Sequence, residues 1–65
     1  MITVNNREHP FTPGMTVASL LKEKGYVFPM LVVKLNGEVV EDKDFAVTAV
    51  NDGDDVLAIH VFAGG

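Results

Sequence analysis

The sequence predicts an α+β domain in which one short helix packs on a mixed sheet of four to five strands. Only one segment, between Thr16 and Gly25, spaces its apolar residues as a helix does. The rest of the chain alternates short apolar runs with turn-forming residues, which is typical of strands. With 65 residues, the chain is long enough for one domain with one core, which we expect to span residues 1–65.

The chain opens with a predicted hairpin. Apolar and polar residues alternate over residues 2–4, and Asn5 and Asn6 tolerate the positive φ angles of a tight turn. We expect the return strand at residues 9–12. It should lie at a sheet edge or be irregular, because Pro10 has no amide hydrogen to donate.

A helix of about two turns is predicted next. Thr16 is a good N-cap, and Gly25 is a common terminator. Two lysines near the C-terminal end interact favourably with the helix dipole. The apolar stripe consists of Val17, Leu20 and Leu21. So short a helix is not stable alone, and we expect a sheet to cover this stripe.

The strongest hairpin signal lies in the middle of the chain. Residues 30–35 are β-branched and apolar, the turn pair Asn36 and Gly37 follows, and residues 38–40 resume the strand pattern. Residues 41–50 then combine a polar break with apolar residues whose spacing fits either a strand or a short turn.

A turn cluster at residues 51–55 precedes the last predicted strand, Val56–Phe62. The order strand, strand, helix, strand, strand, strand predicts the β-grasp type of fold. Both faces of the last strand are apolar. One short helix covers only one face of a sheet, so we expect the other face to form a patch that a partner covers.

The candidate docking residues on this strand are Leu57, Ile59 and Phe62. The alternation alone fits either face pointing inward. An alternative is that large side chains fold around the sheet edge and cover the patch.

The charge balance argues against nucleic acid as a ligand, because the chain has a net charge of −4. Seven of the nine acidic residues lie from Glu38 onward, where Lys43 is the only basic residue. A partner that meets this half should be basic. The alternative is that the acidic charge serves only solubility.

Few residues offer catalytic or metal-binding chemistry. The chain has no cysteine, and His9 and His60 lack the spacing of a metal site. Ser19, the only serine, lies in the predicted helix rather than in a nucleophile elbow. The first residues do not resemble a secretory signal, and no apolar run approaches the roughly 18 residues that span a bilayer. We expect a cytoplasmic protein, monomeric when free, without a metal, a membrane contact or an enzymatic activity of its own.

The sequence ends in Ala63, Gly64 and Gly65. Glycine lets a backbone enter a channel too narrow for side chains, so residues 63–65 are expected to form a flexible arm. The carboxylate at Gly65 is a poor electrophile and would need activation by ATP. The alternative is a frayed tail without a role.

Several features together resemble the sulfur carrier proteins of thiamin biosynthesis, the ThiS family, which have a ubiquitin-like β-grasp fold. In chain order they are Thr16-Val17 with Leu20-Leu21, Asn36-Gly37-Glu38-Val39-Val40, Asp52-Gly53-Asp54 and Val61-Phe62-Ala63-Gly64-Gly65. The resemblance spans nearly the whole chain.

The resemblance implies a carrier that is a co-substrate and binds no cofactor itself. An adenylating, ThiF-like enzyme would use ATP and Mg²⁺ to activate the carboxylate of Gly65, which Gly64 and Ala63 make accessible. Sulfur from a donor such as a cysteine desulfurase would then replace AMP. The resulting thiocarboxylate would give its sulfur to a ThiG-like thiazole synthase.

The chain departs from the family after Val40, where members often have a Pro-Arg pair and this chain has Glu41 and Asp42. We expect this difference to affect partner pairing rather than mechanism. A carrier for molybdopterin or another sulfur-containing metabolite is an alternative. A different class of function, a β-grasp interaction module with an incidental Gly-Gly tail, is a second alternative.

Overall fold

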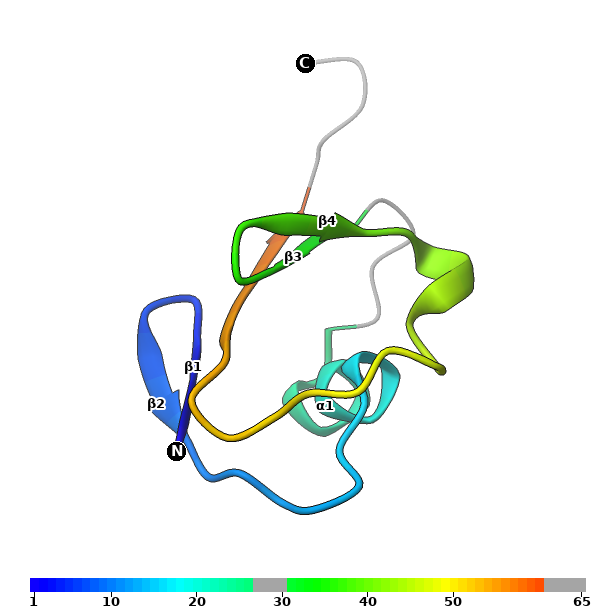
Figure 1. Cartoon of the computed structure of the whole chain (residues 1–65). Coiled ribbons are helices and arrows are strands. Elements are labelled where there is room, and N and C mark those ends of the chain that lie inside the picture. Colours follow the sequence, from blue (N-terminus) through cyan, green and yellow to red (C-terminus); the bar gives the residue numbers. More distant parts are fainter. Residues whose placement is uncertain (27–30, 61–65) are drawn as a thin grey trace.

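Within the described residues, five strands form one mixed sheet and one α-helix packs against one of its faces (Figure 1). The computed structural model describes residues 1–26 and 31–60. The elements are β1 (Ile2–Val4), β2 (Arg7–His9), α1 (Val17–Lys24), β3 (Leu31–Leu35), β4 (Glu38–Val40), the 3₁₀ helix η1 (Asp42–Asp44) and β5 (Asp55–His60). The predicted α+β class, with one helix on a mixed sheet, is confirmed.

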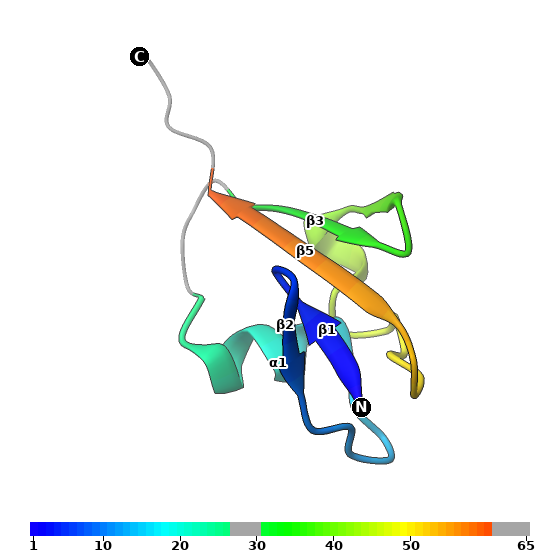
Figure 2. The same cartoon turned by 90° about the vertical axis from the view of Figure 1, so that its left-hand side faces the viewer.

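The strand order is β2-β1-β5-β3-β4, so the last strand in sequence is the central strand of the sheet. Figure 2 shows β5 running between β1 and β3. It pairs parallel with β1 and antiparallel with β3, whereas both hairpins are antiparallel. Asp55 and Val56 at the start of β5 pair with β1, and the strand pairs with β3 from Val56 through His60.

The first hairpin forms, but its second strand lies earlier than predicted. Asn5 and Asn6 both have positive φ, 52° and 66°, and make a two-residue turn. Pairing therefore resumes at once, with Val4 opposite Arg7. The prediction of a return strand at residues 9–12 was wrong, because β2 ends at His9, just before Pro10, which has no amide hydrogen to donate.

The helix begins and ends where the sequence predicts. The Thr16 hydroxyl accepts a hydrogen bond from the Ser19 amide at 3.2 Å, and the Ser19 hydroxyl accepts one from the Thr16 amide at 2.9 Å. This reciprocal capping box explains the role of the single serine. Gly25 closes the helix in the left-handed conformation with φ of 75°, which glycine adopts at little cost.

Residues 41–50 form η1 and a turn rather than a strand. Their backbone instead supports the start of α1: the Ala18 amide donates to the Phe45 carbonyl at 2.9 Å, and the Val17 amide donates to the Thr48 carbonyl at 3.0 Å. An isolated bridge joins Thr16 to Ala49. The two possibilities left open by the sequence are thereby resolved in favour of a turn.

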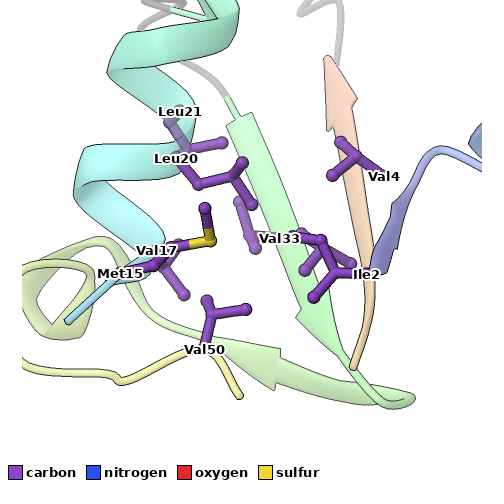
Figure 3. Packing of buried hydrophobic residues seen from close by; sticks show 9 residues of the cluster. Ile2, Val4, Met15, Val17, Leu20, Leu21, Val33 and Val50 are labelled. Carbon is purple, nitrogen blue, oxygen red and sulfur yellow. The ribbon is translucent and has the colours of Figure 1, made fainter. Parts of the chain in front are cut away.

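The core lies between α1 and the sheet (Figure 3). In that view the side chains of the helix point toward Val33 of β3 and toward Ile2 and Val4 of β1. The buried apolar residues are Ile2, Val4, Met15, Val17, Leu20, Leu21, Val33, Val50 and Val56. The predicted helical stripe is fully part of this core.

The remaining strands agree with the sequence within the described residues. β3 and β4 form the hairpin predicted around Asn36 and Gly37, whose φ angles are 52° and 85°. β5 begins one residue earlier than predicted, at Asp55. The predicted strand ends at Met30 and Phe62 lie outside the described residues.

Candidate functional site: the outward face of β3, β4 and β5

Side chains of β5 point alternately to the two sides of the sheet, and the core fixes which side is inward. Val56 is completely buried, and Ala58 packs against the core cluster. Leu57 and Ile59 therefore point away from the helix, and 46% of Ile59 is exposed. The structure thus shows which face of the last strand points inward, which the sequence left open.

The pairing register places further side chains beside these two. In β3, Val32 lies opposite Ile59 and Lys34 lies opposite Leu57. In β4, Val39 lies opposite Lys34, and 61% of Val39 is exposed. Opposite residues on adjacent strands have Cβ atoms about 5 Å apart, so the five side chains are neighbours.

We call this surface the outward face and define it by Val32, Lys34, Val39, Leu57 and Ile59. It is apolar except for Lys34, which lies between Leu57 and Val39. Exposed apolar side chains that gather on one face of a small protein mark an interaction site. The outward face is therefore a candidate binding surface for another protein.

Polar groups border the outward face on the side of β1. The Thr3 hydroxyl donates a hydrogen bond to Asp55 Oδ1 at 2.7 Å. The Ala58 amide donates to the side-chain oxygen of Asn5 at 2.8 Å, just beyond the last residue of β1. The contact surface thus changes from apolar to polar between β5 and β1.

A hydrogen-bonded turn anchors the start of β5 to the β3–β4 hairpin. Asn36 donates through Nδ2 to Asp54 Oδ1 at 3.0 Å and accepts from the Asp55 amide at 2.8 Å. Asp54 also accepts from the Asn51 amide at 2.8 Å. These contacts join the two elements that carry the outward face, so the acidic turn has a structural role.

The candidate site residues divide into two groups. Leu57 and Ile59 lie together on the outward face, whereas their alternation predicted only that they share a face. Phe62, Ala63, Gly64 and Gly65 lie outside the described residues, and their roles stay predictions. Sequence reasoning missed Val32, Lys34 and Val39, although the turn at Asn36 and Gly37 and the alternation of residues 31–40 could have placed them on one side.

The histidines do not form a metal site within the described ranges. His9 Nε2 lies 3.3 Å from Glu23 Oε1, a contact that lacks hydrogen-bond geometry and links β2 to α1. No group of three or more His, Cys, Asp or Glu residues is arranged to hold a metal ion in residues 1–26 and 31–60. In the same ranges, no helix is both long and apolar enough for a membrane crossing.

Comparisons with known proteins agree with this fold. A model of the ThiS family matches residues 2–65. The crystal structure of the thiamine biosynthesis protein ThiS from Geobacter metallireducens superposes with a TM-score of 0.83 at 33% identity, covering 98% of this chain and 97% of that one. The β-grasp prediction is thereby confirmed.

A curated relative is larger. A protein named thiazole synthase, from Paramagnetospirillum magneticum, is 41% identical over 64 residues, which cover 98% of this chain and 19% of that protein. The chain therefore spans about a fifth of the length of this relative.

Proposed function

The chain belongs to the ThiS family, and from this premise we propose that it carries sulfur on the carboxylate of Gly65 and delivers it for thiazole formation in thiamin biosynthesis. The single observation that carries the proposal is the family match, which extends through the terminal Gly-Gly. The apolar outward face supports it, because a carrier needs a surface on which successive enzymes dock.

The proposed cycle begins with activation. An adenylating enzyme joins the Gly65 carboxylate to the AMP of ATP, with Mg²⁺ bound to the nucleotide, and releases pyrophosphate. A persulfide sulfur, supplied by a donor such as a cysteine desulfurase, attacks the acyl carbon and AMP leaves. A thiol then reduces the acyl disulfide and frees the thiocarboxylate.

The protein's own part in this cycle is docking and delivery. Leu57 and Ile59 contact the enzymes through the outward face, and both side chains belong to β5, which pairs with β3 along Val56–His60. Phe62 is a further docking candidate. Ala63 and Gly64 present Gly65 without bulky side chains. The protein is a co-substrate and performs no catalysis.

The second partner in the proposal is a thiazole synthase. The relative named thiazole synthase supports this choice, because a segment similar to this chain lies within it. This observation favours the thiamin pathway over molybdopterin or another sulfur-containing product.

Reconstitution with intact-mass measurement tests the proposed function. The full chain is incubated with the adenylating enzyme of the same organism, ATP, Mg²⁺, a cysteine desulfurase, cysteine and a thiol. We expect the mass to rise by the difference between sulfur and oxygen, with the change localised to Gly65. A chain that lacks Gly64 and Gly65 is the matched control and should stay unchanged.

An unchanged wild-type mass with an active adenylating enzyme would contradict the proposal. If cells whose chain lacks Gly64 and Gly65 still grew in medium without thiamin, the result would favour the interaction module with an incidental tail.

A further inference from the structure

We propose that Lys34 selects the partner: the outward face fits a protein surface that is apolar and carries a carboxylate opposite Lys34. Of the enzymes proposed to dock on this face, we assign this selectivity to the thiazole synthase, because a segment similar to this chain lies within a protein of that name; the inference therefore rests on the proposed function. It adds a specificity-determining residue that sequence reasoning missed.

Lys34 has apolar neighbours on both adjacent strands. Leu57 lies opposite it on β5, and Val39 lies opposite it on β4. The side chain is half-buried, as expected when the aliphatic part of a lysine lies along apolar side chains and the ammonium group stays in water. A partner that covers these neighbours also covers the ammonium group.

None of the acidic residues in the described part of the chain forms an ion pair with Lys34. Asp55, two positions before Leu57, accepts a hydrogen bond from Thr3 on the β1 side. Glu38 lies opposite Leu35 and alternates to the core side of the sheet. The ion pairs found among the described residues involve the amino terminus, His9 and Lys43.

The cost of desolvation makes the unpaired charge of Lys34 discriminate between partner surfaces. Covering an ammonium group with apolar atoms removes its hydration and gives nothing in return, so a purely apolar partner is rejected. A carboxylate placed opposite Lys34 restores a charge-assisted hydrogen bond and offsets that cost. The same cation thus disfavours one class of surface and favours another.

The partner charge that Lys34 requires is opposite to the partner charge that the whole molecule attracts. The net charge of −4 attracts basic surfaces over long range. Lys34 requires an acidic group at short range. A partner that satisfies both carries a carboxylate within an apolar contact and basic residues around it.

Binding measurements with the thiazole synthase test the inference. Calorimetry gives the Kd of the full wild-type chain and of the variants Lys34→Met and Lys34→Glu. The first variant removes the charge and keeps much of the side-chain length, and the second reverses the charge. Lys43→Glu is the matched control, because it makes the same charge change on η1, outside the outward face.

We expect Lys34→Glu to raise Kd by at least about tenfold and Lys34→Met to raise it by a smaller factor. In both variants the carboxylate of the thiazole synthase, buried at the interface, loses the ammonium group that it pairs with. Lys43→Glu should change Kd by less than about threefold. Thermal melting of each variant confirms folding before binding is compared.

Equal or tighter binding by Lys34→Met would overturn the inference, as would equal effects of Lys34→Glu and Lys43→Glu. So would the absence of binding by the wild-type chain. The measurement requires no sulfur loading, so its failure is distinguishable from failure of the proposed function, which is read from the mass at Gly65.

Discussion

The two faces of the sheet differ in side-chain chemistry although the same strands build both. On the inward side, Val33 and Val56 are completely buried beneath the helix. On the outward side, Val39 and Ile59 are exposed, and Lys34 lies among them. The inward face holds the fold together, whereas the outward face has apolar side chains that the fold itself does not need.

This difference teaches how so short a chain combines folding and recognition. Alternation along a strand separates the two tasks residue by residue, so one substitution should affect stability and its neighbour should affect binding. The predictions below test this separation.

The largest effect should come from placing a carboxylate on each face of β5. Val56→Asp buries an unpaired charge, which costs several kcal/mol and is comparable to a total stability of about 5 kcal/mol. We expect this variant to be unfolded by circular dichroism. Ile59→Asp should change the free energy of unfolding by less than about 1 kcal/mol and should weaken thiazole synthase binding by at least about tenfold.

The separation of the two faces would be refuted if both variants were unfolded, or if both were folded with equal affinity for thiazole synthase.

A moderate effect is expected at the turn that joins the outward-face strands. Asn36→Ala removes the hydrogen bonds with Asp54 and Asp55 and places alanine at a φ of 52°. We expect a loss of about 2 to 3 kcal/mol in urea unfolding.

Asn6→Ala is the matched control for this turn. Asn6 has a similar φ of 66°, and no hydrogen bond of its side chain is found within the described residues. We expect a loss of about 1 kcal/mol. Equal losses at the two positions would show that the side-chain contacts of Asn36 do not stabilise the sheet.

The smallest effect should come from a surface ion pair that contributes to neither face. The ammonium group of Met1 lies 2.5 Å from Asp52 Oδ1, and the hydrogen bond and charge of that group lower the pKa of Asp52 below its usual value. Because the folded-state pKa is lower than the unfolded one, the stabilisation is present above the unfolded pKa and is lost as pH falls through the folded pKa.

Urea unfolding of the wild type and Asp52→Asn over a pH series measures this contribution. The difference between them should be small and constant near neutral pH and should shrink below about pH 4. It should also decrease with added salt, because both groups are exposed. A difference that is independent of pH would contradict the assigned ion pair.

Local signals in the sequence predicted most elements of the fold. The Asn5-Asn6 and Asn36-Gly37 turns and the caps at Thr16 and Gly25 depend on residues a few positions apart. Their chemistry can therefore be recognised without knowing the rest of the chain. The error in the second strand arose because the two-residue turn restarts pairing at once.

Long-range contacts determined the features that local sequence signals did not predict. Residues 41–50 form a turn because their carbonyls accept hydrogen bonds from the first turn of α1. The inward face of β5 follows from the burial of Val56 in the core, and the pairing of β5 with β3 places Lys34 beside Leu57. Neither pairing can be recognised from neighbouring residues alone.

The measurement that tests the sulfur-carrier account most directly follows the sulfur atom itself. The chain is loaded at Gly65 with isotopically labelled sulfur and mixed with thiazole synthase and its remaining substrates. The account predicts labelled thiazole and a chain returned to its carboxylate mass. Unlabelled thiazole, or label retained on the chain while thiazole forms, would contradict it.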